Sequence, residues 1–60
     1  MMAIRIIKRQ DGVYDAYDRA SGKWLLTRSA PDNILSWLSE LKLVWVEFID
    51  ETLLKEGNHV

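Results

Sequence analysis

The feature that most constrains this chain is the apolar stretch "LKLVWVEFID", residues 41–50. From Val44 to Ile49 the side chains are mostly β-branched or aromatic, and such side chains suit a pleated strand better than a helix. Successive side chains of a strand point to opposite faces. One face then carries Val44, Val46 and Phe48, and the other carries Leu43, Trp45 and Ile49 beside Glu47. We therefore predict a strand that is apolar on both faces.

A helix is the alternative structure for this stretch. It would align an apolar face from Leu41 to Leu53, but it would leave Leu43 and Val46 in water. The choice between strand and helix decides whether one copy can bury its apolar side chains without a partner, because a strand with two apolar faces needs cover on both sides.

The N-terminal part of the chain is typical of a β-hairpin. "AIRIIKR" (3–9) and "VYDAYD" (13–18) flank Asp11-Gly12, and Asp-Gly is a strong signal for a two-residue hairpin turn. A turn centred there pairs Lys8 with Asp15, Arg5 with Asp18, Ile7 with Ala16, and Ile6 with Tyr17. The two oppositely charged pairs favour this register.

A second hairpin follows directly. In "RASGK" (19–23), Gly22 suits the left-handed position of a three-residue hairpin loop. "KWLLTR" (23–28) is then the third strand of an antiparallel meander.

The period changes after the third strand. In "SAPDNILSWLSEL" (29–41), Ser29 is the predicted N-cap, with Asp32 three residues later as a variant of the capping box. Pro31 is compatible with a first helical turn. One stripe of the predicted helix collects Ile34, Leu35, Trp37, Leu38 and Leu41.

These elements predict a small α+β domain with the order β-β-β-α-β. It consists of a three-stranded antiparallel meander, one helix on one face of the sheet, and a fourth strand after the helix. Because short crossovers are right-handed, strand four is expected parallel to strand one and beside it. The domain covers residues 1–52, and residues 53–60 are expected to form a polar C-terminal tail.

One helix covers one face of such a sheet, so the other face is left open. With the register above, the helix is predicted to cover Ile4, Ile6, Tyr17 and Leu25. The open face then carries Ile7, Ala16, Trp24 and Leu26, with Arg5, Arg9, Tyr14, Asp18 and Arg28 around them. An apolar centre with aromatic and arginine neighbours is typical of an interface.

We therefore expect a partner-binding face made of Arg5, Ile7, Arg9, Tyr14, Trp24, Leu26 and Arg28. Leu43, Trp45 and Ile49 are the candidates for contacts of strand four with a second copy. A 60-residue chain has a thin stability margin, and without cysteine it forms no disulfide. A homodimer is the simplest expectation. The alternative is that these residues wrap the core edge of a monomer.

Residues typical of catalysis or of metal sites are sparse. Asp15 and Asp18 are an odd number of positions apart on one strand, so they point to opposite faces and cannot flank one substrate atom. His59 is the single histidine and lies with Glu56 near the C-terminus, a position more typical of solvated residues than of metal ligands. We expect a non-enzymatic protein without metal, cofactor or small-molecule substrate.

The apolar runs are too short for a signal peptide or a membrane span. Together with the absence of cysteine, this favours a cytoplasmic protein that does not bind membranes.

A family likeness lies in "IIKRQDGVYDAYDRASGKWLLTRSAPDNILSWL", residues 6–38. The run resembles the arm-type DNA-binding domain of phage integrases in its KR-x-DG first hairpin, its Gly-Lys second hairpin and its helix after strand three. The resemblance implies a sheet that binds DNA, and Arg5, Arg9 and Arg28 with Tyr14 and Trp24 are suited to that role. The chain departs from the family in its less basic third strand, its net charge of −1 and its apolar fourth strand.

We therefore expect a small protein-binding or regulatory module that acts on a protein partner, on itself, or on both. Phage-encoded modulators of host proteins are similar in size and composition. A nucleic-acid-binding module that uses the sheet face is the alternative.

Overall fold

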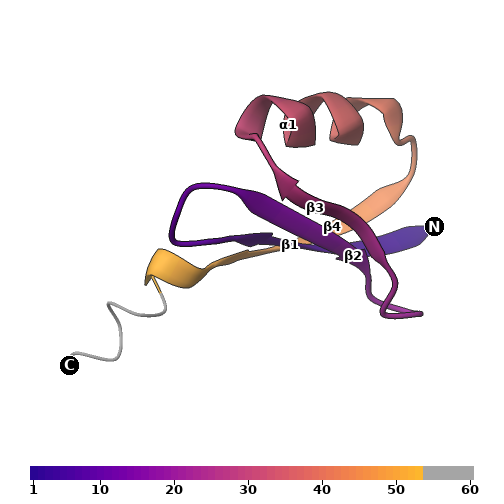
Figure 1. The fold of residues 1–60 in the computed structure, drawn as a ribbon. Coiled ribbons are helices and arrows are strands. Elements are labelled where there is room, and N and C mark those ends of the chain that lie inside the picture. The colour runs from indigo at the N-terminus through magenta and orange to yellow at the C-terminus, as the bar shows by residue number, and fades with distance from the viewer. Residues whose placement is uncertain (54–60) are drawn as a thin grey trace.

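The computed structural model describes residues 1–53 and has a small α+β fold. Its elements are β1 (Met2–Lys8), β2 (Tyr14–Asp18), β3 (Trp24–Ser29), α1 (Pro31–Glu40) and β4 (Val44–Asp50) (Figure 1). The predicted order β-β-β-α-β is confirmed, and the stretch 44–50 is a strand. Residues 51–53 continue from β4 in a helical turn. Apart from Leu53, the expected tail lies outside the described residues.

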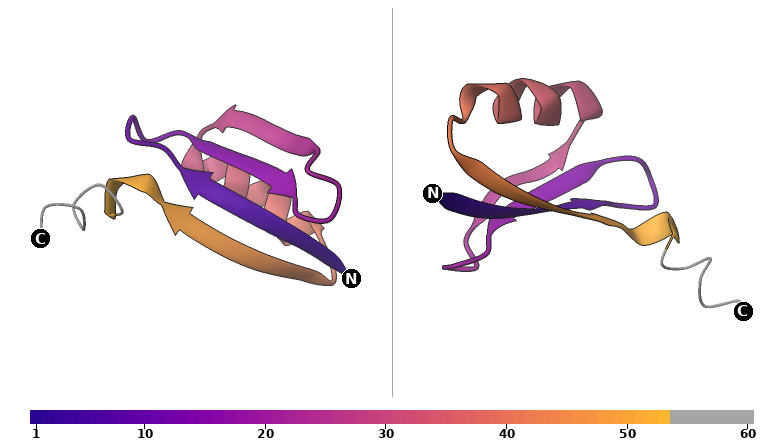
Figure 2. Two further views of the ribbon diagram at one scale, coloured as in Figure 1. Left: turned by 90° about the horizontal axis from the view of Figure 1, so that it is seen from below. Right: turned by 180° about the vertical axis from the view of Figure 1, so that it is seen from behind.

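The four strands form one sheet in the order β3-β2-β1-β4. β1 pairs antiparallel with β2 and parallel with β4, so the predicted place of strand four beside strand one is confirmed. The left view of Figure 2 shows the sheet from the side opposite α1, with β3 and β4 at its two edges. The sheet therefore ends in a parallel strand on one side and an antiparallel strand on the other.

The predicted register of the first hairpin is wrong by one residue. Ile6 lies opposite Ala16 and Arg5 opposite Tyr17, because the loop holds three residues, 10–12, rather than two. The Arg9 amide donates to the Val13 carbonyl across a distance of 2.8 Å and closes this loop. Gly12 provides the left-handed residue that a three-residue loop requires, with φ of 90°.

The second hairpin contains two irregularities in β3. Its loop is one residue longer than expected, since the Gly22 amide donates to the Asp18 carbonyl over 2.7 Å and Lys23 is the first paired residue after it. Gly22 has the predicted left-handed conformation, with φ of 77°. Beyond the loop, the register shifts between Tyr17 and Ala16 and again between Ala16 and Tyr14. These shifts decide which side chains of β3 share a face.

The core lies between α1 and the centre of the sheet. Ile4, Ile6, Ala16 and Ile34 form one buried cluster, and α1 therefore covers the face that carries Ile4 and Ile6, as predicted. The helix begins at Pro31 with Ala30 as its N-cap and no side-chain cap. The predicted cap at Ser29 is wrong because Ser29 still belongs to β3, opposite Tyr14.

The corrected register redistributes side chains between the two faces. Directly opposed residues share a face. Tyr17 therefore lies with Arg5 on the open face rather than under the helix, and Ala16 lies with Ile6 under the helix rather than on the open face. Because of the first shift in β3, Leu26 lies beside Ala16 while Trp24 lies beside Tyr17. The predicted open face is correct for Trp24 and Ile7 and wrong for Ala16 and Leu26.

Candidate protein-binding surfaces

The first candidate surface is β4, the outer strand of the sheet. It runs for seven residues without a register shift against β1, and within residues 1–53 no strand pairs with its other side. Trp45 is 62% exposed and Phe48 is 55% exposed, on opposite faces of the strand. We call Val44–Asp50 with its free outer side the β4 edge. Such a long, regular and apolar edge is rare without protection, because it can pair with another strand.

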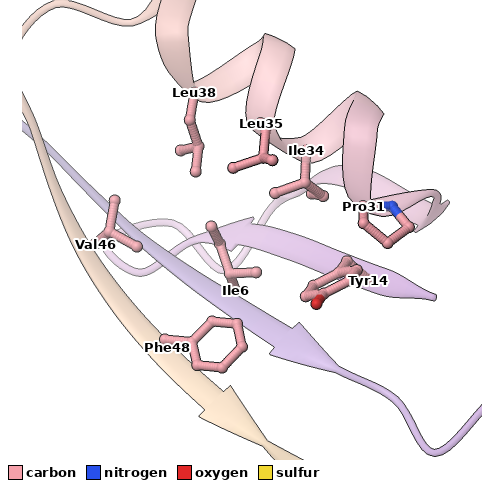
Figure 3. Close-up of a pocket in the computed structure, with 8 residues that line it drawn as sticks. All are labelled: Ile6, Tyr14, Pro31, Ile34, Leu35, Leu38, Val46 and Phe48. Carbon is pink, nitrogen blue, oxygen red and sulfur yellow. The ribbon is translucent and has the colours of Figure 1, made fainter. Parts of the chain in front are cut away.

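A groove runs along the helix side of this edge. The groove has a volume of about 250 Å³ and separates α1 from β4 (Figure 3). Pro31, Ile34, Leu35 and Leu38 line it from α1, and Ile6, Tyr14, Val46 and Phe48 line it from the sheet. In Figure 3 the side chains of Leu35 and Leu38 point from the helix toward the sheet. We call this the α1–β4 groove.

The groove is open because α1 is short and packs over the middle of the sheet. Ile4 and Ile6 of β1 are 0% and 2% exposed under α1. Their neighbours on β4, Val46 and Phe48, keep about half of their surface exposed, and Leu35 on the helix is exposed as well. The Phe48 ring leans on Tyr14, with 6.2 Å between ring centroids. The apolar lining is therefore accessible from the β4 side.

The second candidate surface is the open face of the sheet, where Arg5 is the centre of a polar network. Its guanidinium donates to the Glu47 carboxylate and, over 2.7 Å, to the Tyr17 hydroxyl. The Arg5 guanidinium carbon also lies 5.7 Å from the centroid of the Tyr17 ring. Trp24 packs edge-on against that ring at 5.0 Å between centroids, and Arg19 approaches Glu47 to 3.8 Å. The hydrogen bond to Glu47 is the main reason that the pKa of Arg5 is raised.

Asp15 is the most buried charged side chain among residues 1–53 and joins three segments. It accepts a hydrogen bond from the Arg28 amide at 2.6 Å and another from the Arg9 guanidinium at 2.6 Å. Arg9 also donates to Glu51 at 2.6 Å. The bond from the Arg28 amide is the main reason that the pKa of Asp15 lies below its usual value of 3.8, and the bond from Arg9 lowers it further. These contacts join Arg9, directly after β1, to β2 and to the second irregularity of β3.

The residues of the predicted partner-binding face do not all meet on one surface. Arg5, Ile7 and Trp24 lie on the open face, while Tyr14 and Leu26 pack against the core under α1. Arg9 is bound to Asp15 and Glu51, and Arg28 to Asp11 at 2.9 Å. The predicted ion pairs of Lys8 with Asp15 and of Arg5 with Asp18 are wrong, because the one-residue shift removes them. Arg5, Arg9 and Arg28 are therefore each neutralised by a carboxylate.

The candidates for dimer contacts lie at the β4 edge. Trp45 and Ile49 belong to β4 and point to the open face, and the exposed Leu43 directly precedes the strand. Val46, Phe48 and Leu35 were missed as candidates. The alternation of β4 places Val46 and Phe48 on the helix side of the sheet. A helix of three turns cannot cover all four strands, so the side chains of the edge strand could have been expected to stay exposed.

The two carboxylates of β2 do not meet, as the sequence predicted. Asp15 lies opposite Ile7 and Asp18 opposite Ile4, so the two carboxylates point to opposite faces. In residues 1–53 there is no group of three or more histidine and carboxylate side chains suited to a metal ion. Glu56 and His59 lie outside the described residues. No helix in residues 1–53 has the length and apolar character needed to cross a membrane.

Comparison with protein-family models, with curated proteins and with solved structures gave no significant match.

Proposed function

We propose that this chain is a non-enzymatic protein-binding module that binds its partner by adding a strand to the β4 edge. In this binding mode, backbone hydrogen bonds provide affinity, and pockets for alternate side chains provide specificity. The observation that carries the proposal is the regular β4 edge, with exposed Trp45 on one face and exposed Phe48 on the other.

The α1–β4 groove supports this function. A strand laid along β4 would project every second side chain over the groove, whose sheet side is formed by Val46 and Phe48. Its volume of about 250 Å³ suits one or two apolar side chains better than a whole ligand. The groove would therefore select partners that carry apolar residues at alternate positions.

Photo-cross-linking in cells tests the proposal. A photoreactive phenylalanine replaces Phe48 at the β4 edge in one variant and Trp24 on the open face in another. We expect covalent protein adducts from position 48. The same experiment in a Val46→Pro background should remove these adducts, because proline has no amide donor and is tolerated on the free side of an edge strand.

Val46→Thr is the matched control, because threonine keeps both the β-branched shape and the amide. It should retain the adducts. Adducts that appear only from position 24, or adducts from position 48 that persist in Val46→Pro, would overturn strand addition at β4.

Nucleic-acid binding through the open face is the second candidate function. It is favoured by the cluster of Arg5, Tyr17 and the 48% exposed Trp24, since arginine and aromatic rings together bind bases. The resemblance to arm-type domains implies the same face. It ranks second because Glu47 and Asp15 neutralise the arginines of the sheet.

Titration of labelled duplex DNA and single-stranded RNA with the chain tests this second function. If the open face binds phosphates, affinity should fall steeply as salt rises, with a slope that counts the phosphate contacts. Trp24→Ala should weaken binding, and Phe48→Ala, on the helix side of the sheet, should not. Absence of binding at low salt would exclude the function.

A further inference from the structure

We propose that the partner strand at the β4 edge is β4 of a second copy of this chain. The two strands would run antiparallel about a twofold axis that passes beside Val46, and the two sheets would join into one. The inference rests on the proposed function, since it identifies the occupant of the same edge.

The hydrogen-bonding pattern of β4 defines which residues can face a partner. The Met2 amide donates to the Leu43 carbonyl at 3.3 Å, so the backbone polar groups of Leu43 point toward β1. The amide and carbonyl of one residue point to the same side of a strand, and this side alternates along the chain. The backbone groups of Trp45, Glu47 and Ile49 therefore face β1. Those of Val44, Val46 and Phe48 face outward.

An antiparallel partner must oppose these outward residues with its own outward residues. For two identical copies, only a few symmetric registers meet this condition. A register centred on Glu47 would place the two Glu47 carboxylates directly opposite each other on one face, which is unfavourable even though each is paired with Arg5. One centred on Phe48 would oppose Val46 to the charged Asp50.

The register centred on Val46 avoids both conflicts. It places Val44 opposite Phe48, a small side chain against a large one, beside the α1–β4 groove. It also brings Lys42, which lies in the bend just before β4, near Asp50 at the end of β4 of the other copy, so that opposite charges flank the apolar centre on both sides. Charge complementarity between the two ends of β4 in antiparallel copies therefore favours this register.

The open face of the joined sheet fits the same arrangement. Trp45 of one copy lies opposite Glu47 of the other, and Glu47 is already neutralised by Arg5 and Arg19. The two Trp45 side chains are diagonal neighbours across the axis, within reach of each other. Trp45, Val46 and Phe48, which are 62%, 40% and 55% exposed in one copy, would all lose exposure.

Sedimentation velocity of the full chain tests the occupant. We expect a dimer at micromolar concentration for the wild type and for Val46→Thr. Val46→Pro should raise the dissociation constant by roughly thirtyfold or more, because the axis pair loses both of its backbone hydrogen bonds. Far-UV circular dichroism shows whether this variant keeps its fold.

Disulfide cross-linking tests the register without relying on proline. The natural chain contains no cysteine, so each introduced thiol is unique. Val46→Cys should form covalent dimers with itself under mild oxidation, because the two positions face each other on the axis. Phe48→Cys alone should not, and a mixture of the two variants should yield mainly the Val46→Cys homodimer.

The outcomes separate this inference from the proposed function. Preferred cross-linking between positions 46 and 48 would place the axis at Glu47 and overturn the register. A wild-type chain that stays monomeric at millimolar concentration would exclude the second copy, even if position 48 still gave proline-sensitive adducts to another protein. Absence of those adducts as well would remove strand addition altogether.

Discussion

At the scale of single residues, Asp15 is the polar side chain whose substitution should cost the most stability. It lies in the sheet with 8% exposure and accepts hydrogen bonds from the Arg28 amide and the Arg9 guanidinium. Arg28 itself has a left-handed backbone conformation, with φ of 49°, at the second irregularity of β3. The carboxylate therefore stabilises a backbone conformation that arginine adopts reluctantly.

Acid should destabilise the protein partly through Asp15. Its folded pKa lies below the usual 3.8, so its stabilising contribution is complete above that value and is lost as pH falls through the lower folded pKa. Asp15→Asn should lower the free energy of unfolding near neutral pH by roughly 2 kcal/mol, because a charged hydrogen bond to Arg9 is lost. It should also flatten the acid dependence. Urea unfolding between about pH 7 and pH 2 measures both effects. Equal pH slopes in the two proteins would contradict the role of Asp15.

Arg28 allows a test of backbone strain. Arg28→Gly and Arg28→Ala both remove the exposed ion pair with Asp11, but only glycine accepts a left-handed conformation without steric cost. We expect Arg28→Gly to be more stable than Arg28→Ala by roughly 0.5–1 kcal/mol, because relief of strain exceeds the entropy that glycine adds to the unfolded chain. Thermal unfolding of the two variants side by side gives the difference. Equal stability would mean that the conformation carries no strain.

At the scale of elements, α1 is attached to the sheet by one narrow row of side chains. Ile34 is 4% exposed and the adjacent Leu35 is 66% exposed, although both belong to the apolar stripe predicted from the sequence. The stripe is wider than the surface that α1 buries in one copy. Its exposed side borders the α1–β4 groove.

Substitution of these two neighbours should separate folding from binding. Ile34→Ala should destabilise the protein by roughly 3 kcal/mol, the usual cost of truncating a fully buried isoleucine. Leu35→Ala should change the stability of an isolated copy by less than about 0.5 kcal/mol, yet weaken binding at the groove. Urea unfolding at low protein concentration, followed by sedimentation, provides both readings. A large loss of stability in Leu35→Ala would show that the groove is closed in solution.

The elements themselves followed from local sequence. Asp-Gly, Gly22 and the change of period at Pro31 predicted three strands and a helix, and the β-branched run predicted β4. The register of the first hairpin did not follow from local sequence, because Gly12 is compatible with either a two-residue or a three-residue loop. The possible cross-strand ion pairs favoured the two-residue loop, which is wrong. Leu26 lies on the face opposite to the predicted one because of an irregularity in β3. No residue type in this part of the sequence indicates that irregularity.

The candidate surfaces were predicted less well than the elements, for the same reason. A shift of one residue moves every side chain of a strand to the other face. Tyr17 and Ala16 therefore exchanged faces, and with them the composition of the predicted partner-binding face. That Trp45 and Ile49 lie on one face of β4 was predictable, because this face follows from the alternation of the strand itself; their role in dimer contacts stays a prediction.

At the scale of the whole molecule, this chain combines a small core with a large apolar edge. Among residues 1–53, four residues form the buried cluster, and several large apolar side chains along β4 remain accessible. A single copy therefore gains little from burial, in line with the thin margin of a 60-residue chain. Joining two sheets at β4 would extend the hydrogen-bonded ladder and cover these side chains in one step.

This arrangement predicts that stability depends on protein concentration. If dimerisation and folding are coupled, each tenfold increase in concentration should raise the apparent free energy of unfolding by about 1.4 kcal/mol per mole of dimer. Urea midpoints of the wild type and of Val46→Thr should rise accordingly. Midpoints of Val46→Pro should stay constant, because its edge cannot complete the ladder. A wild-type midpoint that is independent of concentration would mean that one copy is stable alone, and that the exposed side chains of β4 serve a different partner.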